Sequence, residues 1–154
     1  MLTQEKNIRL THTGRNTEMG AVFRQYWIPV LLSRQLPEPD GSPVRVKVLG
    51  EELLAFRASD GQVGLVSPRC PHRGADLYFG RNEEQGIRCS YHGWKFDLQG
   101  QCVHMPTSDD DAYCKVKDRA RLTAYPVREW GDMLWAYMGP LDCPELPLME
   151  FALV

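Results

Sequence analysis

Short β-strands are predicted in the middle of the chain by the alternation of apolar and polar positions. Residues 44–48 alternate valine with arginine or lysine, which is the period-two pattern of a half-buried strand. A second apolar stretch, residues 53–56, leads to Asp60-Gly61, a dipeptide that favours a tight hairpin turn. The chain then returns through the apolar residues 63–66. This part of the sequence therefore predicts an antiparallel sheet.

Two further hairpins are predicted toward the C-terminal end. Residues 94–98 alternate large apolar side chains with charged ones before Gln99-Gly100 turns the chain into residues 101–103. Residues 124–128 and the apolar run 133–138 flank a second turn dipeptide, Gly131-Asp132. The predicted fold class is therefore all-β, built from antiparallel sheets.

The N-terminal region has helical spacing instead. Thr17 stands where an N-cap residue would, and apolar residues follow at positions 19, 22, 23 and 26. We expect one short N-terminal helix whose apolar stripe packs on the core. An irregular stretch should follow, because the next segment contains Pro29, Pro37, Pro39 and Pro43.

Composition narrows the range of partners. The 154 residues are 43% hydrophobic and 25% charged, which is ordinary for one globular domain. A net charge of −2 predicts no nucleic-acid partner, and the chain has neither a signal-like start nor an apolar run that could span a bilayer. We therefore expect a cytoplasmic protein without membrane association. In that reducing compartment Cys102, Cys114 and Cys143 are interpreted as thiols without a role.

The most informative feature is a pair of short motifs that combine cysteine with histidine. Cys70 and His72 form C-x-H, and sixteen residues later Cys89 and His92 form C-x-x-H. A 2Fe-2S cluster in which two histidines replace two cysteines on one iron needs this set of ligands. Gly74 and Gly93 follow the histidines closely and can adopt positive φ, which lets backbone N–H groups approach the sulfides.

A structural Cys2His2 zinc site remains the alternative, since it uses the same donor atoms. Such sites usually pair cysteine with cysteine and histidine with histidine, whereas each motif here mixes the two. The other histidines, His12 and His104, have no partner motif and are interpreted as ordinary residues. The acidic run of residues 109–111 is interpreted as a solvated loop.

At these motifs the chain resembles the Rieske iron-sulfur family. The resemblance implies that Cys70 and Cys89 bind the inner iron and that His72 and His92 bind the outer, more exposed iron. Respiratory-complex members join their two loops by a disulfide, but this chain has Ala75 and Tyr91 at those positions.

Two hydroxyl donors of the respiratory-complex members are also missing, because this chain has Trp94 and Phe96 in the place of a serine and a tyrosine. With fewer hydrogen bonds to the sulfurs, we expect a reduction potential near the low end of the Rieske range, about −150 mV.

A larger part of the chain is similar to phthalate-dioxygenase-like Rieske non-haem iron oxygenases, which hydroxylate or demethylate aromatic acids. The segments that carry this resemblance are residues 19–29, 70–77, 91–96, 125–129 and 135–140. The resemblance implies the Rieske fold, with two cluster-binding hairpin loops. We divide the chain into an N-terminal segment (residues 1–43), a Rieske 2Fe-2S domain (44–140) and the start of a linker (141–154).

The resemblance also implies a role in electron transfer. Electrons would come from a flavin and iron-sulfur reductase or from a ferredoxin, and would pass to a mononuclear Fe(II) in a catalytic domain, which in the family belongs to a trimer. That iron needs two histidines and a carboxylate, and the chain has no such motif, so we expect the catalytic domain to be absent from it. The alternative function is a stand-alone Rieske-type ferredoxin that acts as a soluble electron carrier.

Overall fold

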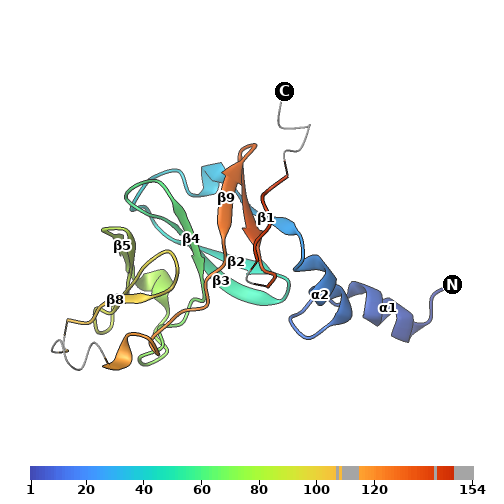
Figure 1. The fold of residues 1–154 in the computed structure, drawn as a ribbon, viewed down its shortest axis with the longest axis horizontal. Helices are drawn as coiled ribbons and strands as arrows, with labels where there is room; N and C mark the ends of the chain where they lie inside the picture. Colours follow the sequence, from blue (N-terminus) through green and yellow to red (C-terminus); the bar gives the residue numbers. More distant parts are fainter. Residues whose placement is uncertain (107, 109–114, 141, 148–154) are drawn as a thin grey trace.

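The structure is a computed structural model that describes residues 1–106, 108, 115–140 and 142–147. The described chain forms three antiparallel sheets with two short α-helices at one end (Figure 1). The predicted fold class, all-β with antiparallel sheets, is thereby confirmed. The helices are α1 (Gln4–Thr11) and α2 (Glu18–Phe23), with single 3-10 turns η1 (Ser33–Gln35) and η2 (Leu77–Phe79). The strands are β1 (Trp27–Leu32), β2 (Val44–Val48), β3 (Glu51–Arg57), β4 (Val63–Val66), β5 (Arg81–Glu83), β6 (Gly86–Arg88), β7 (Lys95–Phe96), β8 (Cys102–His104), β9 (Val127–Trp130) and β10 (Met133–Tyr137).

The sheet β2-β3-β4 lies in the middle, and its strand β3 is buried on both faces along residues 53–56. Side chains alternate along β3, so Leu54 and Phe56 join one hydrophobic cluster while Leu53 and Ala55 join another. The first cluster also contains both motif cysteines. The continuous apolar run of residues 53–56 is therefore a strand buried on both sides, and it links two cores.

The sheet β5-β6-β7-β8 carries the second motif. Cys89 directly follows β6, and β7 starts directly after Trp94, so the second motif forms the tip of a hairpin, as predicted. Cys70 follows β4 by a few residues, so the first motif leaves a strand end, also as predicted. Figure 1 shows this region at the end of the molecule opposite the helices.

Exposure within β7 differs from the simple alternating pattern. Alternation of apolar and charged residues, as along residues 94–98, is typical of a strand with its charged face in solvent, but Lys95 is buried. The strand is only two residues long, and the Lys95 ammonium reaches the Glu84 carboxylate at 3.1 Å. A buried ammonium needs such a partner, so the ion pair makes this position possible for a lysine.

The third sheet has the order β1-β10-β9. The predicted hairpin around Gly131-Asp132 is confirmed, and both turn residues have positive φ, as a type I′ turn requires. The prediction that residues from Pro29 onward are irregular was wrong for β1, which pairs with β10. Proline is tolerated there because β1 is an edge strand and its register shifts between Pro29 and Leu31.

Two helices precede β1, where one was predicted. In α2 the Thr17 side chain caps the helix by accepting a hydrogen bond from the Gly20 N–H, as expected. Its apolar stripe is not core packing, however, because Val22 and Phe23 are exposed. The helix instead packs closely through its backbone against the segment that precedes it. A Cβ at Gly20 would lie 2.0 Å from the Gly14 carbonyl oxygen.

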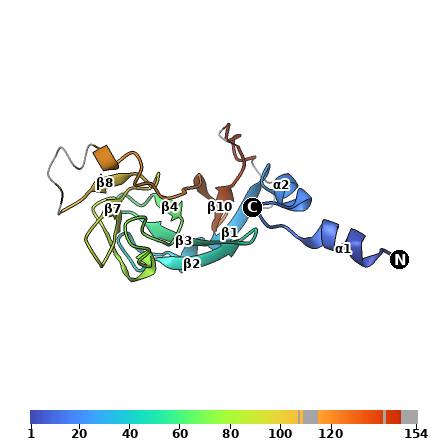
Figure 2. The ribbon, with the colours of Figure 1, turned by 90° about the horizontal axis from the view of Figure 1, so that it is seen from below.

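The first helix, α1, was not predicted, because its few apolar residues give no clear stripe. It contains no buried residue and projects away from the sheets (Figure 2). Across the described ranges, no helix has the length and the apolar character that crossing a membrane would require.

An ion-pair network ties the helical segment to the sheets. Glu51, at the start of β3, binds Arg24 at 2.7 Å and accepts a hydrogen bond from the Tyr125 hydroxyl at 2.7 Å. Burial alone would raise the pKa of Glu51, but Tyr125, Arg24 and Arg15 together lower that pKa overall. The Glu51 carboxylate is therefore ionised at neutral pH and holds three segments together.

The alternation along β3 predicts different effects for neighbouring substitutions. Leu53→Ala and Leu54→Ala should each reduce the free energy of unfolding by about 2–5 kcal/mol, because both side chains are buried. Only Leu54→Ala should increase hydrogen–deuterium exchange in residues 70–74 and 89–93, since Leu54 alone of the two shares a cluster with the motif cysteines. The exposed Leu10→Ala is the matched control, with an expected change within about 0.5 kcal/mol. Equal exchange in both core variants would contradict this division of the core.

Candidate metal centre

Two short loops that carry the predicted ligands are closed by the same pair of backbone hydrogen bonds. In the first loop, the Cys70 N–H donates to the Ala75 carbonyl at 2.9 Å and the Gly74 N–H donates to the Cys70 carbonyl at 2.8 Å. In the second loop, the N–H groups of Cys89 and Gly93 make the equivalent bonds at 2.8 and 3.0 Å. The two loops therefore have a common backbone design, although their histidines stand at different distances from the cysteines.

Both glycines have the conformation predicted for them. Gly74 and Gly93 each have a φ of 72°, in the left-handed region that other residues adopt at a cost. Each lies four residues after its cysteine and makes the turn that brings the chain back beneath the loop. Their positions are thus explained by backbone geometry.

The loops place the four predicted ligands in two pairs. Cys70 and Cys89 are buried, and their thiol groups lie within interaction distance of each other. The rings of His72 and His92 are half-buried, with centroids 4.5 Å apart. The indole of Trp94 stacks on the His72 ring at 4.4 Å and belongs to the cluster that holds both cysteines. The sequence thus correctly predicted residues that meet in space.

Electrostatics favours the uncharged form of one residue in each pair, Cys70 and His72. Burial raises the pKa of the Cys70 thiol to about 11, and the neighbouring Cys89 adds to this rise. Burial also lowers the pKa of His72, and the positive charges of His92 and Arg73 lower it further. The imidazole is thus held neutral, which is the form that binds metals, whereas a metal would have to displace the thiol protons.

These donors fit a 2Fe-2S cluster. The Nδ1 atom of His72 is buried and has no hydrogen-bond partner in the described part of the chain. An unpaired buried nitrogen costs free energy, and coordination to iron would remove that cost. Among the described residues, no three His, Cys, Asp or Glu side chains surround a position for one ion. A 2Fe-2S cluster needs only two protein ligands for each iron, so it does not require such a group of three.

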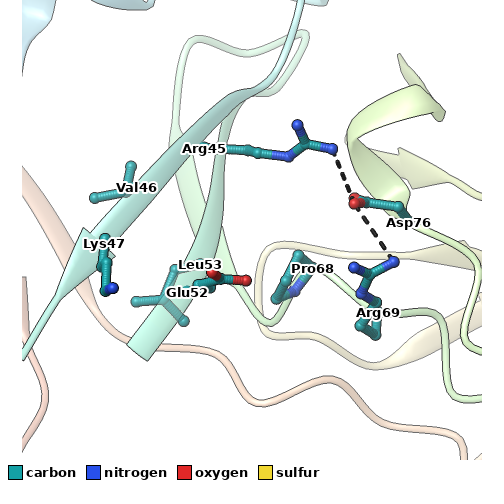
Figure 3. Close-up of a pocket in the computed structure, with 8 residues that line it drawn as sticks. All are labelled: Arg45, Val46, Lys47, Glu52, Leu53, Pro68, Arg69 and Asp76. Atoms are coloured by element: carbon teal, nitrogen blue, oxygen red, sulfur yellow. Dashed lines mark hydrogen bonds and ion pairs between the residues drawn. The ribbon is translucent and has the colours of Figure 1, made fainter. Parts of the chain in front are cut away.

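Asp76 fixes the end of the first loop, and sequence reasoning gave it no role. Its carboxylate binds Arg45 at 2.9 Å and Arg69 at 3.5 Å (Figure 3). It also accepts a hydrogen bond from the Tyr78 N–H. Arg45, Arg69 and Asp76 line one side of a cavity of about 410 Å3 between β2, β3 and the first loop. The sequence signal that could have indicated this role is an acidic residue two positions after Gly74.

The remaining candidates from the sequence do not join the site. His12 caps the C-terminal end of α1, and His104 lies in β8. Cys143 is an exposed thiol. The acidic residues 109–111 and Cys114 lie outside the described residues.

Comparison with known proteins shows the family of this chain. Residues 26–126 match the family described as Rieske [2Fe-2S] domain, so the chain belongs to this family. The predicted cofactor, a Rieske-type 2Fe-2S cluster, is thereby confirmed, and the zinc alternative is wrong. The predicted Rieske fold is confirmed as well.

Several relatives of the chain are oxygenase subunits. It is 46% identical over 142 residues to the phthalate 4,5-dioxygenase oxygenase subunit of Pseudomonas putida, covering 92% of this chain and 32% of the relative. It is 48% identical over 152 residues to the 3-chlorobenzoate-3,4-dioxygenase oxygenase subunit of Comamonas testosteroni, covering 97% of this chain and 34% of the relative. A crystal structure of dicamba monooxygenase with non-heme iron and dicamba superposes with a TM-score of 0.70 at 27% identity, covering 87% of this chain and 40% of that one.

The predicted resemblance to phthalate-dioxygenase-like Rieske oxygenases is therefore confirmed. The chain spans about a third of the length of these curated relatives.

The two loop glycines differ in the space around them, which gives a testable difference. Gly74→Ala should cost about 1–2 kcal/mol of stability through the positive φ alone, because no atom lies within 4 Å of the added Cβ. Gly93→Ala should cost more, since its Cβ would also lie 2.9 Å from the Pro106 ring. Thermal unfolding and bound iron should rank wild type first, Gly74→Ala second and Gly93→Ala last. Gly74→Asn should fall between wild type and Gly74→Ala, because asparagine tolerates this conformation better. A Gly74→Ala protein as stable as wild type would contradict the explanation.

Proposed function

We propose that Cys70 and Cys89 bind one iron of the 2Fe-2S cluster and that His72 and His92 bind the other. The observation that carries this proposal is the unpaired, buried Nδ1 of His72 beside the His92 ring. The burial of both thiols supports the assignment of the cysteines to the inner iron. The partial exposure of both imidazoles supports their assignment to the outer iron.

When bound, the cluster supplies a one-electron redox couple. The protein around it excludes water from the cysteine side, where Cys70 and Cys89 lie in a core with Leu54 and Phe56. On the other side, the edges of the two imidazoles remain the nearest ligand atoms to solvent and to a partner. Tyr91, which is exposed, lies on the His92 ring with centroids 3.8 Å apart and extends this contact surface.

The biological role that these features support is electron transfer within a Rieske oxygenase. In this proposal a flavin and iron-sulfur reductase or a ferredoxin delivers electrons to the cluster. The electrons then pass to a mononuclear non-haem iron that hydroxylates or demethylates an aromatic acid. The names of the two relatives given above, a phthalate and a 3-chlorobenzoate dioxygenase, support this substrate class.

The proposal places the mononuclear iron outside residues 1–154. The relatives are about three times as long as the matched region, and the chain has only four histidines, two of which are assigned to the cluster. In this view residues 1–43 precede the Rieske domain of residues 44–140, and residues 141–154 begin a linker to the catalytic domain. The electron acceptor would be a catalytic domain of the same family, within a trimer.

A stand-alone ferredoxin is the weaker candidate. The alignment with the 3-chlorobenzoate dioxygenase subunit covers 97% of the chain, so it includes residues on both sides of the Rieske match at 26–126. An isolated carrier would give these flanking segments no reason to resemble an oxygenase subunit.

Electron uptake without oxygenation is the expected behaviour of the 154-residue chain. The purified protein should contain two irons and two sulfides and should accept one electron from dithionite, because the loops hold one cluster. It should not hydroxylate phthalate or 3-chlorobenzoate, even with added Fe(II) and a reductase, because the oxygen-activating iron is proposed to lie elsewhere. Absorption spectra, titration with reductant and product analysis would check these outcomes. Hydroxylation by the 154 residues alone would contradict the proposal.

A further inference from the structure

A row of basic side chains crosses the sheet beside the second ligand loop. The strand register places Arg81 opposite Arg88, Arg88 opposite Lys95, and Lys95 opposite His104. Directly paired residues of antiparallel strands project from the same face, and like charges opposite each other are destabilising. Placing these like-charged side chains opposite one another therefore costs free energy, which suggests that the positive charge has a function.

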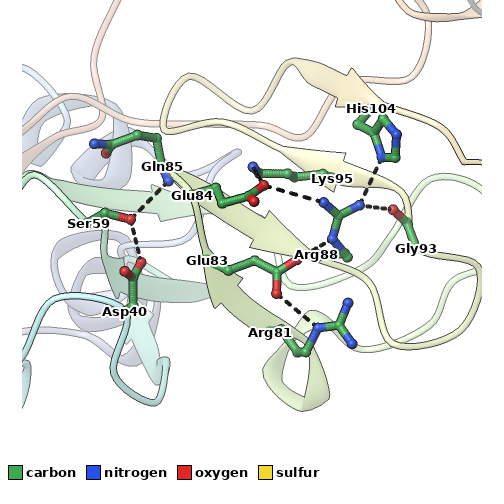
Figure 4. Close-up of polar contacts among 10 residues, drawn as sticks. All are labelled: Asp40, Ser59, Arg81, Glu83, Glu84, Gln85, Arg88, Gly93, Lys95 and His104. Carbon is green, nitrogen blue, oxygen red and sulfur yellow. Dashed lines mark hydrogen bonds and ion pairs between the residues drawn. The ribbon is translucent and has the colours of Figure 1, made fainter.

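Arg88 occupies the centre of this row and has an unusual set of contacts. Its side chain is only 14% exposed. The guanidinium donates to the Gly93 carbonyl at 2.9 Å and to Nδ1 of His104 at 2.9 Å, and it binds the Glu83 carboxylate through Nε (Figure 4). Because arginine has only donors, Nδ1 of His104 must act as the acceptor. One guanidinium thus joins β5, β8 and the second ligand loop.

The contact with Gly93 fixes the peptide that shapes the loop. The Gly93 N–H donates to the Cys89 carbonyl at 3.0 Å, and the Gly93 carbonyl accepts from Arg88. This residue stands directly after His92 and has a φ of 72°. Holding both sides of Gly93 restricts the rotation that would move the imidazole of its neighbour.

The first loop offers a comparison within the same chain. Arg69 stands directly before Cys70, as Arg88 stands directly before Cys89. The Arg69 side chain is 62% exposed, however, and within the described part of the chain its ion-pair partner is Asp76, at 3.5 Å. The two arginines at equivalent positions therefore have different contacts. Arg88 hydrogen-bonds the loop that follows it, whereas Arg69 is exposed and binds Asp76.

The charges around Arg88 do not cancel. Arg81, Arg88 and Lys95 are cations, while Glu83 and Glu84 are the carboxylates that pair with them. Three positive charges against two negative ones leave an excess of positive charge beside the loop. Positive charge near a cluster stabilises its reduced form, which has gained an electron, and so raises the reduction potential.

We propose that Arg88 is a positioning residue for the Rieske cluster: it holds the second ligand loop through Gly93 and supplies positive charge that raises the reduction potential. This inference rests on the proposed assignment of Cys89 and His92 as ligands. The positive charge of Arg88 partly offsets the low reduction potential that we expect from the missing hydroxyl donors at Trp94 and Phe96.

Two substitutions separate the effect of the charge from that of the contacts. Arg88→Gln removes both, whereas Arg88→Lys keeps the charge but cannot reach Gly93, Glu83 and His104 at once. One matched control is Arg69→Gln, at the equivalent position of the first loop. The other is Arg81→Gln, because native Arg81 also binds Glu83, at 3.1 Å. For each protein, the measurements are the midpoint potential, the EPR g values and the rate of iron loss to a chelator. Hydrogen–deuterium exchange of residues 89–94 in the iron-free protein adds a measurement that does not need the cluster.

Arg88→Gln should lower the midpoint potential and speed iron loss about tenfold or more, as substitutions behind metal ligands commonly do. Arg88→Lys should keep a potential near that of wild type, yet lose iron faster and show altered g values. Exchange in residues 89–94 should rise in both variants and should match wild type in both controls. Arg81→Gln removes a cation of the same row, but the Arg81 side chain is 71% exposed and screened by solvent, so the potential should fall less than in Arg88→Gln.

Arg88 variants that match Arg69→Gln in potential, iron loss and exchange would overturn the inference. If Arg88→Gln fails to fold, Arg88→Lys decides by its rate of iron loss and its exchange. A wild-type chain that binds no iron would overturn the ligand assignment itself, and this inference with it.

Discussion

Convergence of two loops is the constraint on which this structure depends. Each loop contributes one cysteine and one histidine, so neither can form the metal centre alone. The backbone solves this in the same way twice, with an N–H of the cysteine and an N–H of a left-handed glycine closing each loop. In the proposed assignment, the cost of burying two thiols and an imidazole nitrogen is offset because iron would take the place of the missing partners.

The rest of the fold supplies rigid supports for the loops. The middle sheet presents Leu54 and Phe56 to the core beneath the cysteines and Leu53 and Ala55 to the core shared with β10. Polar contacts complete the support, with Asp76 at the end of the first loop and Arg88 beneath the second. Both act from outside the set of residues that carry the metal chemistry.

Sequence patterns predicted those parts of the molecule that depend on local rules. Alternation located β2, and the Gly131-Asp132 turn located the last hairpin, because both follow from side-chain direction and positive φ. The ligand motifs met in space as expected, since their spacing reflects the chemistry of the cluster. Each of these signals is contained in a few neighbouring residues.

The features that were missed depend on contacts between distant residues. The strand β1 escaped prediction because Pro29 disfavours a strand unless an edge position and a bulge accommodate it. The burial of Lys95 could not be read from the sequence, because its partner, Glu84, lies on another segment. The role of Arg88 is likewise visible only once the register of β5 to β8 is known.

The measurement that tests the central claim most directly is pulsed EPR of the reduced protein with histidine labelled by 15N. The account predicts two strongly coupled nitrogens that change with the label, of which one is lost in His92→Cys and none in His12→Gln. A spectrum without histidine nitrogen coupling, or one that His92→Cys leaves unchanged, would contradict the assignment of His72 and His92 as ligands of one iron.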